Sequence, residues 1–164
     1  MKHFAIWTAF VMGLYVLQTS LLPLIAFHGV SVDLMLLLTV SFAFLHGLRQ
    51  GALMGFLTGL LQDLATGTFL GMHTFSQTLI GLACGRMANG VFKEQFFLPV
   101  SASLVAAAVN YFILAALMLL LGYRFNLMGH MQYTLLPMLI YQLAFAYPVH
   151  HLAYELDKRY GKKA

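Results

Sequence analysis

The sequence has 164 residues, of which 61% are hydrophobic and 9% are charged, and its formal net charge is +4. Soluble domains carry roughly 25% charged residues and membrane spans need about 20 apolar ones, so the composition indicates a membrane protein with no room for a soluble domain. It therefore excludes an embedded ATPase, an extramembrane enzyme domain and a nucleic-acid-binding module, each of which needs on the order of 50 residues with its own core.

Six apolar segments follow one another along the chain, separated by glycine, proline, histidine or charged residues. The first, of about 24 residues, is too long for a signal-peptide core, so we expect a retained helix. Only Arg49 and Gln50, flanked by glycines, separate the second segment from the third, which predicts a tight helical hairpin. The predicted spans cover about residues 4–27, 30–48, 51–70, 73–89, 97–122 and 133–152, and a basic tail follows at 153–164.

The positions of the nine lysine and arginine residues predict the orientation of these spans. With six spans and a cytoplasmic N-terminus, Arg124 lies on the outer side and the other eight lie on the inner side. This asymmetry follows the positive-inside rule, so we expect an all-α integral membrane protein, a compact bundle of six transmembrane helices with both termini cytoplasmic. The inner cations are Lys2, Arg49, Arg86, Lys93, Lys158, Arg159, Lys162 and Lys163.

Glycine recurs every four residues through the third segment and again in the fourth. Because four residues turn a helix by about 400°, such a series stays close to one helix face. A face without side chains lets another helix backbone approach closely, which is how helices associate in lipid. Packing inside the bundle is the favoured interpretation, and docking of a partner helix is the alternative. The series consists of Gly47, Gly51, Gly55 and Gly59, then Gly67 and Gly71 after Asp63, with Gly81 and Gly85 in the fourth segment.

Two carboxylates, Asp33 and Asp63, fall at the outer ends of predicted spans. An ionised group at such a position needs a partner, so each is a candidate functional residue. Capping of the second helix is the simpler interpretation for Asp33, whereas Asp63 lies near the end of its own helix, where a carboxylate opposes the helix dipole. Arg124, the outer cation, is a candidate ion-pair partner for either.

The sequence lacks the spacings that catalysis and metal binding require, such as a Ser, His and Asp constellation, an HExxH motif or a Gly-rich phosphate loop. Its one cysteine, Cys84, cannot form an intrachain disulfide. We therefore expect no enzyme activity, metal or cofactor. Gln18, Asn110 and Gln142 interrupt apolar segments, and we expect them to hydrogen-bond between helices or to line a small polar pocket.

The second and third segments carry a recurring set of motifs. These are Asp33-Leu34-Met35-Leu36-Leu37-Leu38, Arg49-Gln50-Gly51, Gly55-Phe56, Gly59-Leu60-Leu61-Gln62-Asp63-Leu64 and the glycines Gly67 and Gly71. Together they resemble the family of the rod shape-determining protein MreD, over about residues 33–71. Chain length, span number and orientation agree with that family.

The resemblance implies a non-enzymatic subunit of the cell-elongation machinery in the bacterial plasma membrane, with a fold similar to the S components of energy-coupling-factor transporters. It implies binding to MreC, a single-span protein, and action with the RodA glycosyltransferase, its transpeptidase and MreB filaments in peptidoglycan synthesis, with membrane lipid as surroundings. The candidate partner-binding or helix-packing residues are Asp33, Arg49, Gly51, Gly55, Gly59, Gln62, Asp63, Gly67, Gly71, Gly81, Gly85 and Arg124.

A second function stays open, that of an S component which captures a vitamin-like ligand for such a transporter. Ala5 and Ala9 form an AxxxA pattern at the inner end of the first segment, where S components contact their transporter module. The predicted outer loops are short and have few polar residues for a ligand pocket, which favours the scaffold.

The predicted orientation has a direct test. A reporter that is active only in the cytoplasm, fused after Ala164, is expected to be active, and the same reporter inserted beside Arg124 is expected to be inactive, because the cation asymmetry places these positions on opposite sides. Activity at Arg124, or inactivity after Ala164, would contradict the six-span topology.

Overall fold

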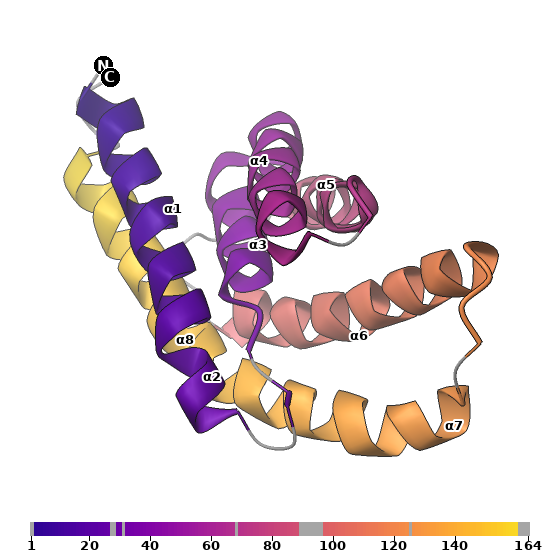
Figure 1. The fold of residues 1–164 in the computed structure, drawn as a ribbon. Coiled ribbons are helices and arrows are strands. Elements are labelled where there is room, and N and C mark those ends of the chain that lie inside the picture. Colours follow the sequence, from indigo (N-terminus) through magenta and orange to yellow (C-terminus); the bar gives the residue numbers. More distant parts are fainter. Residues whose placement is uncertain are drawn as a thin grey trace.

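The computed structural model describes residues 2–26, 29–30, 32–67, 69–88, 97–124 and 126–160. Each predicted segment corresponds to one long helix (Figure 1). The described part of the chain is helical throughout, apart from its turns and connections. The all-α class is therefore confirmed. The elements are α1 (Lys2–Ser20), α2 (Leu22–Ile25), α3 (Leu34–His46), α4 (Leu48–Thr66), α5 (Met72–Met87), α6 (Phe97–Leu120), α7 (Leu127–His130), the π-helix η1 (Met131–Leu135) and α8 (Leu136–Tyr160).

Within the described ranges, α6 is the one helix that is both long and apolar enough to cross a membrane by itself. It has 24 residues with a mean hydropathy of 2.2. The Ala5–Ser20 part of α1 and the whole of α3 are apolar but shorter. The helix positions thus agree with the six predicted segments, and the number of spans stays a prediction.

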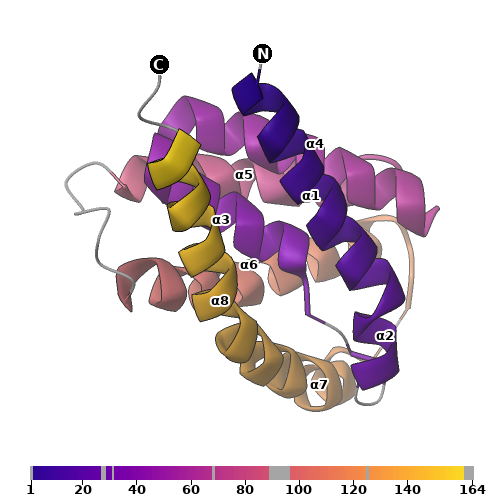
Figure 2. The same ribbon diagram turned by 90° about the vertical axis from the view of Figure 1, so that its left-hand side faces the viewer.

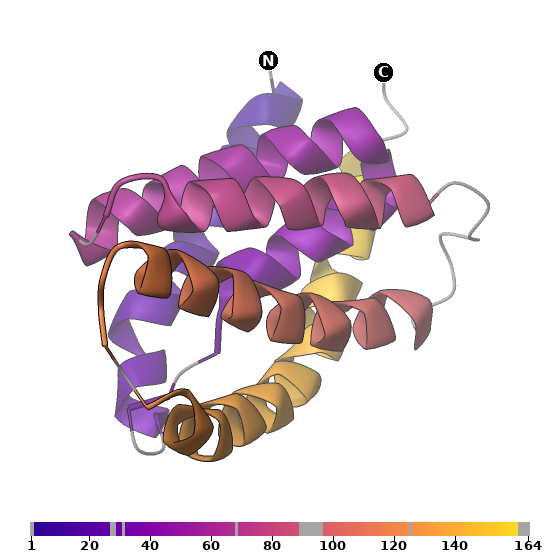
Figure 3. The ribbon, with the colours of Figure 1, turned by 90° about the vertical axis from the view of Figure 1, so that its right-hand side faces the viewer.

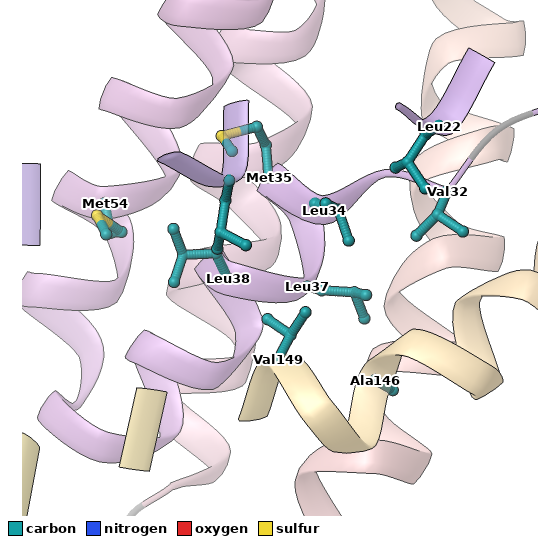
Figure 4. Packing of buried hydrophobic residues seen from close by; sticks show 10 residues of the cluster. Leu22, Val32, Leu34, Met35, Leu37, Leu38, Met54, Ala146 and Val149 are labelled. Atoms are coloured by element: carbon teal, nitrogen blue, oxygen red, sulfur yellow. The ribbon is translucent and has the colours of Figure 1, made fainter. Parts of the chain in front are cut away.

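Helix α3 forms the centre of the molecule and packs against α1, α4, α5, α6 and α8. The side chains of its first two turns are almost completely buried, and Leu34, Leu36 and Leu38 have no exposed surface. One side of α3 packs on α8 and α4, where Leu37 lies next to Val149 (Figure 4). The other side packs on α5 and α6. A helix with apolar residues on every side, as α3 has apart from Thr39 and Ser41, belongs in such an interior position.

Helices α4, α5 and α6 lie side by side, with α5 in the middle (Figure 3). The glycine series occupies the contact between α4 and α5. A Cβ atom added to Gly59 would lie 2.5 Å from the carbonyl oxygen of His73, and one added to Gly51 would lie 2.7 Å from that of Gly81. A Cβ on Gly55 would meet the carbonyl oxygen of Gln77. The backbones of α4 and α5 therefore touch, and this face is filled from within the chain.

The turns at the two ends of α4 depend on glycines with positive φ. Gly47, with φ of 85°, is the single residue between α3 and α4, so the predicted tight hairpin is confirmed. Gly67 and Gly71, with φ of 61° and 107°, belong to the turn between α4 and α5. They shape this turn and do not extend the helix face that ends at Gly59.

The helix boundaries differ most from the predicted spans at the end of α1 and at the end of α8. The first predicted span extends to residue 27, but α1 ends at Ser20 and a new short helix begins after Leu21, because Pro23 fits only the first turn of a helix. At the other end of the chain, α8 continues past residue 152 to Tyr160, where Glu155 and Arg159 pair at 3.3 Å.

The long C-terminal helix also determines how the ends of the molecule are placed. Pro148 lies inside α8, which curves through the structure (Figure 2). A proline inside a helix removes one backbone hydrogen bond and bends the helix, which agrees with this curvature. The end of α8 and the start of α1 lie at the same end of the molecule (Figure 1).

The contact between α4 and α5 predicts the effect of larger side chains. Gly55→Leu or Gly59→Leu should lower stability by at least about 1–3 kcal/mol, because the new side chain meets backbone that cannot move away as a side chain could. Thermal unfolding of the purified protein in detergent measures the loss.

Gly13→Leu in α1 is the matched control, because a Cβ atom at Gly13 has no atom within 4 Å. It should leave the unfolding temperature unchanged or slightly raised, since leucine is a better helix former than glycine. Equal stability of Gly55→Leu and Gly13→Leu would contradict the close backbone contact.

Candidate functional site

A carboxylate begins the central helix and satisfies its first backbone groups. The Asp33 Oδ1 atom accepts a hydrogen bond from the backbone N–H of Leu36 at 3.0 Å, so the predicted N-cap is confirmed. The Oε1 atom of Gln18, on α1, accepts from the N–H of Met35 at 3.1 Å. Two N–H groups that an isolated helix would leave free are thus bonded inside the protein.

Glutamines from three helices converge on this helix start. Besides Gln18 of α1, the Gln62 side chain of α4 donates its Nε2 hydrogen to Asp33 Oδ1 at 2.9 Å. Gln142 of α8 accepts from the Asp33 N–H and donates to the Asp33 carbonyl, both at 3.4 Å. The hydrogen bonds between helices expected for Gln18 and Gln142 are therefore present, and Asp33 links α3 to both α4 and α8.

The network continues from Gln62 into the contact between α4 and α5. Gln77 of α5 donates its Nε2 hydrogen to Gln62 Oε1, and Thr58 Oγ1 donates to Gln77 Oε1 at 2.8 Å. Thr58 Oγ1 also lies 2.8 Å from Thr39 Oγ1 on α3. All of these side chains are buried. The chain of polar side chains from Asp33 to Thr39 thus joins α3, α4 and α5.

The members Gln77, Thr58 and Thr39 were missed by sequence reasoning. A signal existed for Gln77, since it is a long polar side chain in the middle of the predicted span 73–89. Threonine in a helix gives no such signal, because its hydroxyl can bond to the carbonyl four residues earlier, as Thr66 does with Gln62 at 2.9 Å.

Asp63 caps a helix other than its own. One carboxylate oxygen, Oδ2, accepts from the N–H of Gly71 at 2.9 Å and from the N–H and hydroxyl of Thr74 at 3.0 and 2.6 Å. The other, Oδ1, accepts from the N–H of His73 at 2.9 Å. Gly71, at the N-cap position of α5, has no side chain for this purpose. The charge that opposes the dipole of α4 therefore lies at the favourable end of α5.

The candidate ion pair of Arg124 with Asp33 or Asp63 is absent from the structure. Arg124 is exposed, and among the residues placed in the structure no ion pair joins it to Asp33 or Asp63. The physical reason is that amide, hydroxyl and backbone N–H donors already surround both carboxylates, so neither needs a cation.

Of the remaining predicted residues, Asn110 and Gly85 contact neighbouring helices, whereas Arg49 lies on the surface. Asn110 of α6 accepts a hydrogen bond from the Ser76 hydroxyl of α5 at 2.7 Å, which is the expected bond between helices. Gly85 packs against Gly47, since a Cβ atom there would lie 2.8 Å from the Gly47 carbonyl oxygen. Arg49 is exposed in the first turn of α4, apart from the buried network.

Among the described residues, the candidate reactive groups of this site are used in contacts within the chain. Asp33 and Asp63 already accept bonds from protein donors, and Cys84 is buried in the apolar contact between α3, α5 and α6. Over the described ranges, no group of three or more histidine, cysteine or acidic side chains is placed to hold a metal ion. The buried network serves to fix helices relative to one another.

The fold and this network define a class: an all-helical protein with an apolar helix long enough to cross a membrane, held together by internal hydrogen bonds. The particular family follows from comparison with known families. Residues 1–158 match the family of the rod shape-determining protein MreD, and the chain belongs to that family. The family is membrane-associated and determines rod shape, so this chain has a role in rod shape determination.

Comparisons with curated proteins and with solved structures gave no match. The expected similarity to S components of energy-coupling-factor transporters therefore stays a prediction. The match over residues 1–158 extends far beyond the motif region at 33–71 that first indicated the family.

The cap supplied by Asp63 predicts a local effect of its removal. Asp63→Asn should lower stability by about 1–3 kcal/mol, because an amide nitrogen would replace one of the two oxygens that face N–H groups. Hydrogen exchange should become faster at His73 and Thr74 in particular.

Glu155→Gln is the matched control, since its partner Arg159 is a surface residue and such pairs contribute at most about 1 kcal/mol. Unchanged exchange in the first turn of α5 after Asp63→Asn would contradict the capping role.

Proposed function

We propose that the protein is a non-enzymatic scaffold subunit of the cell-elongation complex in the bacterial plasma membrane. In this role it binds a single-span MreC-like protein and helps to organise peptidoglycan synthesis by a RodA-type glycosyltransferase and its transpeptidase, together with MreB filaments. The family match over residues 1–158 carries the proposal. The internal use of both outer carboxylates supports a scaffold, because a rigid, saturated core suits a protein that positions partners.

The location of the cations supports the proposed six spans with both termini cytoplasmic. Arg49 begins α4, and Arg86 follows Gly85, which packs against Gly47 at the same end of the molecule. The end of α8 joins them, since Asp157 lies 3.1 Å from His46 at the end of α3. Cations gathered at one end agree with the positive-inside rule.

Arg124 belongs to the opposite end. The ring of the preceding residue, Tyr123, lies 6.3 Å from that of Phe69 in the turn between α4 and α5. This turn is at the other end of α4 from Arg49. A single cation there agrees with an outer surface.

The partner-binding surface proposed here differs from the one that the glycine series suggested. The glycines and the outer carboxylates were candidates for seating a partner's transmembrane helix, but both are occupied by contacts within the chain. A partner helix must therefore use outward-facing side chains. Those of α6 are numerous, and they include Val105, Val109 and Phe112.

Co-purification from membranes tests the proposed function. A tagged copy of the full chain, solubilised in a mild detergent, should retain an MreC-like protein identified by mass spectrometry. A membrane protein of similar size and abundance with the same tag is the control for chance capture. Recovery of an ATPase module instead, with thermal stabilisation by a vitamin, would contradict the scaffold and support the S-component alternative.

A further inference from the structure

An apolar groove of about 580 Å³ lies between α1, α3 and α4, away from the buried network. Its volume falls within the roughly 300–1,000 Å³ of small-molecule sites. Helix α4 supplies one wall with residues from Gln50 to Leu61, on the side that does not face α5. Helix α1 supplies the opposite wall with residues from Trp7 to Met12, and Phe42 and His46 of α3 form the floor.

The lining changes from polar to apolar along the groove. At one end lie Trp7, Thr8, His46 and Gln50, where the rings of Trp7 and His46 are 5.8 Å apart. The other lining residues are apolar, namely Phe42 and the aliphatic or methionine side chains of α1 and α4. Such a gradient suits an amphiphile, whose headgroup would lie at the polar end and whose chain would follow the groove.

The length of the groove matches one leaflet of a membrane. Eleven helical steps from Gln50 to Leu61 correspond to about 16 Å at 1.5 Å per residue. The hydrocarbon core of a bilayer is about 30 Å thick, so the groove covers about half of it. A hydrocarbon chain of one leaflet has this reach, whereas a transmembrane helix would need a contact surface along the whole thickness.

The residue types also favour a flexible chain over a helix. Helices associate in membranes through small residues that let backbones approach. Among the lining residues that the structure describes there is no glycine or alanine. It has leucines and the methionines Met12 and Met54, whose flexible side chains adapt to an irregular occupant.

The charge around the polar end favours an anionic headgroup. Arg49, exposed on α4, directly precedes Gln50 of the lining. Lys158, exposed at the end of α8, follows Asp157, whose carboxylate lies 3.1 Å from His46, and the neighbouring Arg159 pairs with Glu155 at 3.3 Å. Under the positive-inside rule this end faces the cytoplasm.

We propose that the groove between α1 and α4 binds one acyl chain of an anionic phospholipid from the inner leaflet, with its phosphate headgroup beside Gln50 and Arg49. The proposal rests on the membrane location in the proposed function and not on partner binding. Bound lipid would fill the space between α1 and α4 and hold the two helices at a fixed distance.

The single tryptophan of the chain reports on this site. Trp7 lines the polar end, so bromine atoms on a bound acyl chain should quench its fluorescence. The full-length protein is placed in phosphatidylcholine nanodiscs that contain increasing fractions of brominated phosphatidylglycerol or of brominated phosphatidylcholine. Phosphatidylglycerol should give half-maximal quenching at about a fivefold lower fraction, the effect expected of one nearby cation.

Variants distinguish lipid bound in the groove from lipid that contacts the rest of the protein surface. Leu57→Phe, or independently Leu53→Phe, narrows the groove and should abolish the preference for phosphatidylglycerol. Leu119→Phe on α6, where leucine is exposed to a similar extent, is the control and should keep it. Arg49→Gln should reduce the preference, whereas Arg86→Gln, on a helix that does not line the groove, should not.

Three results would overturn the lipid site. The first is equal quenching by both brominated lipids, and the second is an unchanged preference in both Leu57→Phe and Leu53→Phe. The third is loss of quenching when an MreC-like protein is bound, which would assign the groove to a partner helix. If the lipid preference is absent but the partner still co-purifies, the proposed function stands without this site.

Discussion

The structure depends on the need of buried backbone groups for hydrogen-bond partners in surroundings without water. Helix α3 has 13 residues and is about 20 Å long, so in the proposed six-span topology it is shorter than the roughly 30 Å of a bilayer core, and its first N–H groups lie away from water. Asp33 and Gln18 bond to its first N–H groups, and Gln62 and Gln142 bond in turn to Asp33. The short length of α3 thus explains why α1, α4 and α8 each place a glutamine side chain at its start.

The same surroundings explain why glycines and amides hold the bundle together. Lipid tails are as apolar as leucine, so burial of leucine gives little driving force for helix association in a membrane, and close packing and hydrogen bonds must supply it. Helices α4 and α5 use both, because Gly55 and Gly59 bring the backbones together while Gln62 and Gln77 bond across the contact. Close backbone contact and buried hydrogen bonds together therefore fix α4 and α5 relative to one another.

The sequence predicts the helices well because apolar segments and their breaks are local features. It also predicts the cap at Asp33, the hairpin at Gly47 and the glycine contact, each of which follows from residue type and spacing. It fails where the partner is distant in the chain. Asp63 bonds to the start of the next helix and not to Arg124, and Thr39 reaches Thr58 only because two helices pack at that point. Spacing along one helix cannot show which donors arrive from its neighbours.

The single-residue connection at Gly47 also bears on how the protein enters a membrane during synthesis. Thirteen residues do not span a bilayer, and although Gln18 of α1 is already made when α3 emerges, the Asp33 carboxylate lacks its Gln62 partner until α4 has been made. Because Gly47 is the single residue between α3 and α4, we do not expect α3 to reach its final position in the membrane before α4 has entered it. In the proposed six-span topology we therefore expect α3 and α4 to insert together as a hairpin, with Arg49 at its tip on the cytoplasmic side.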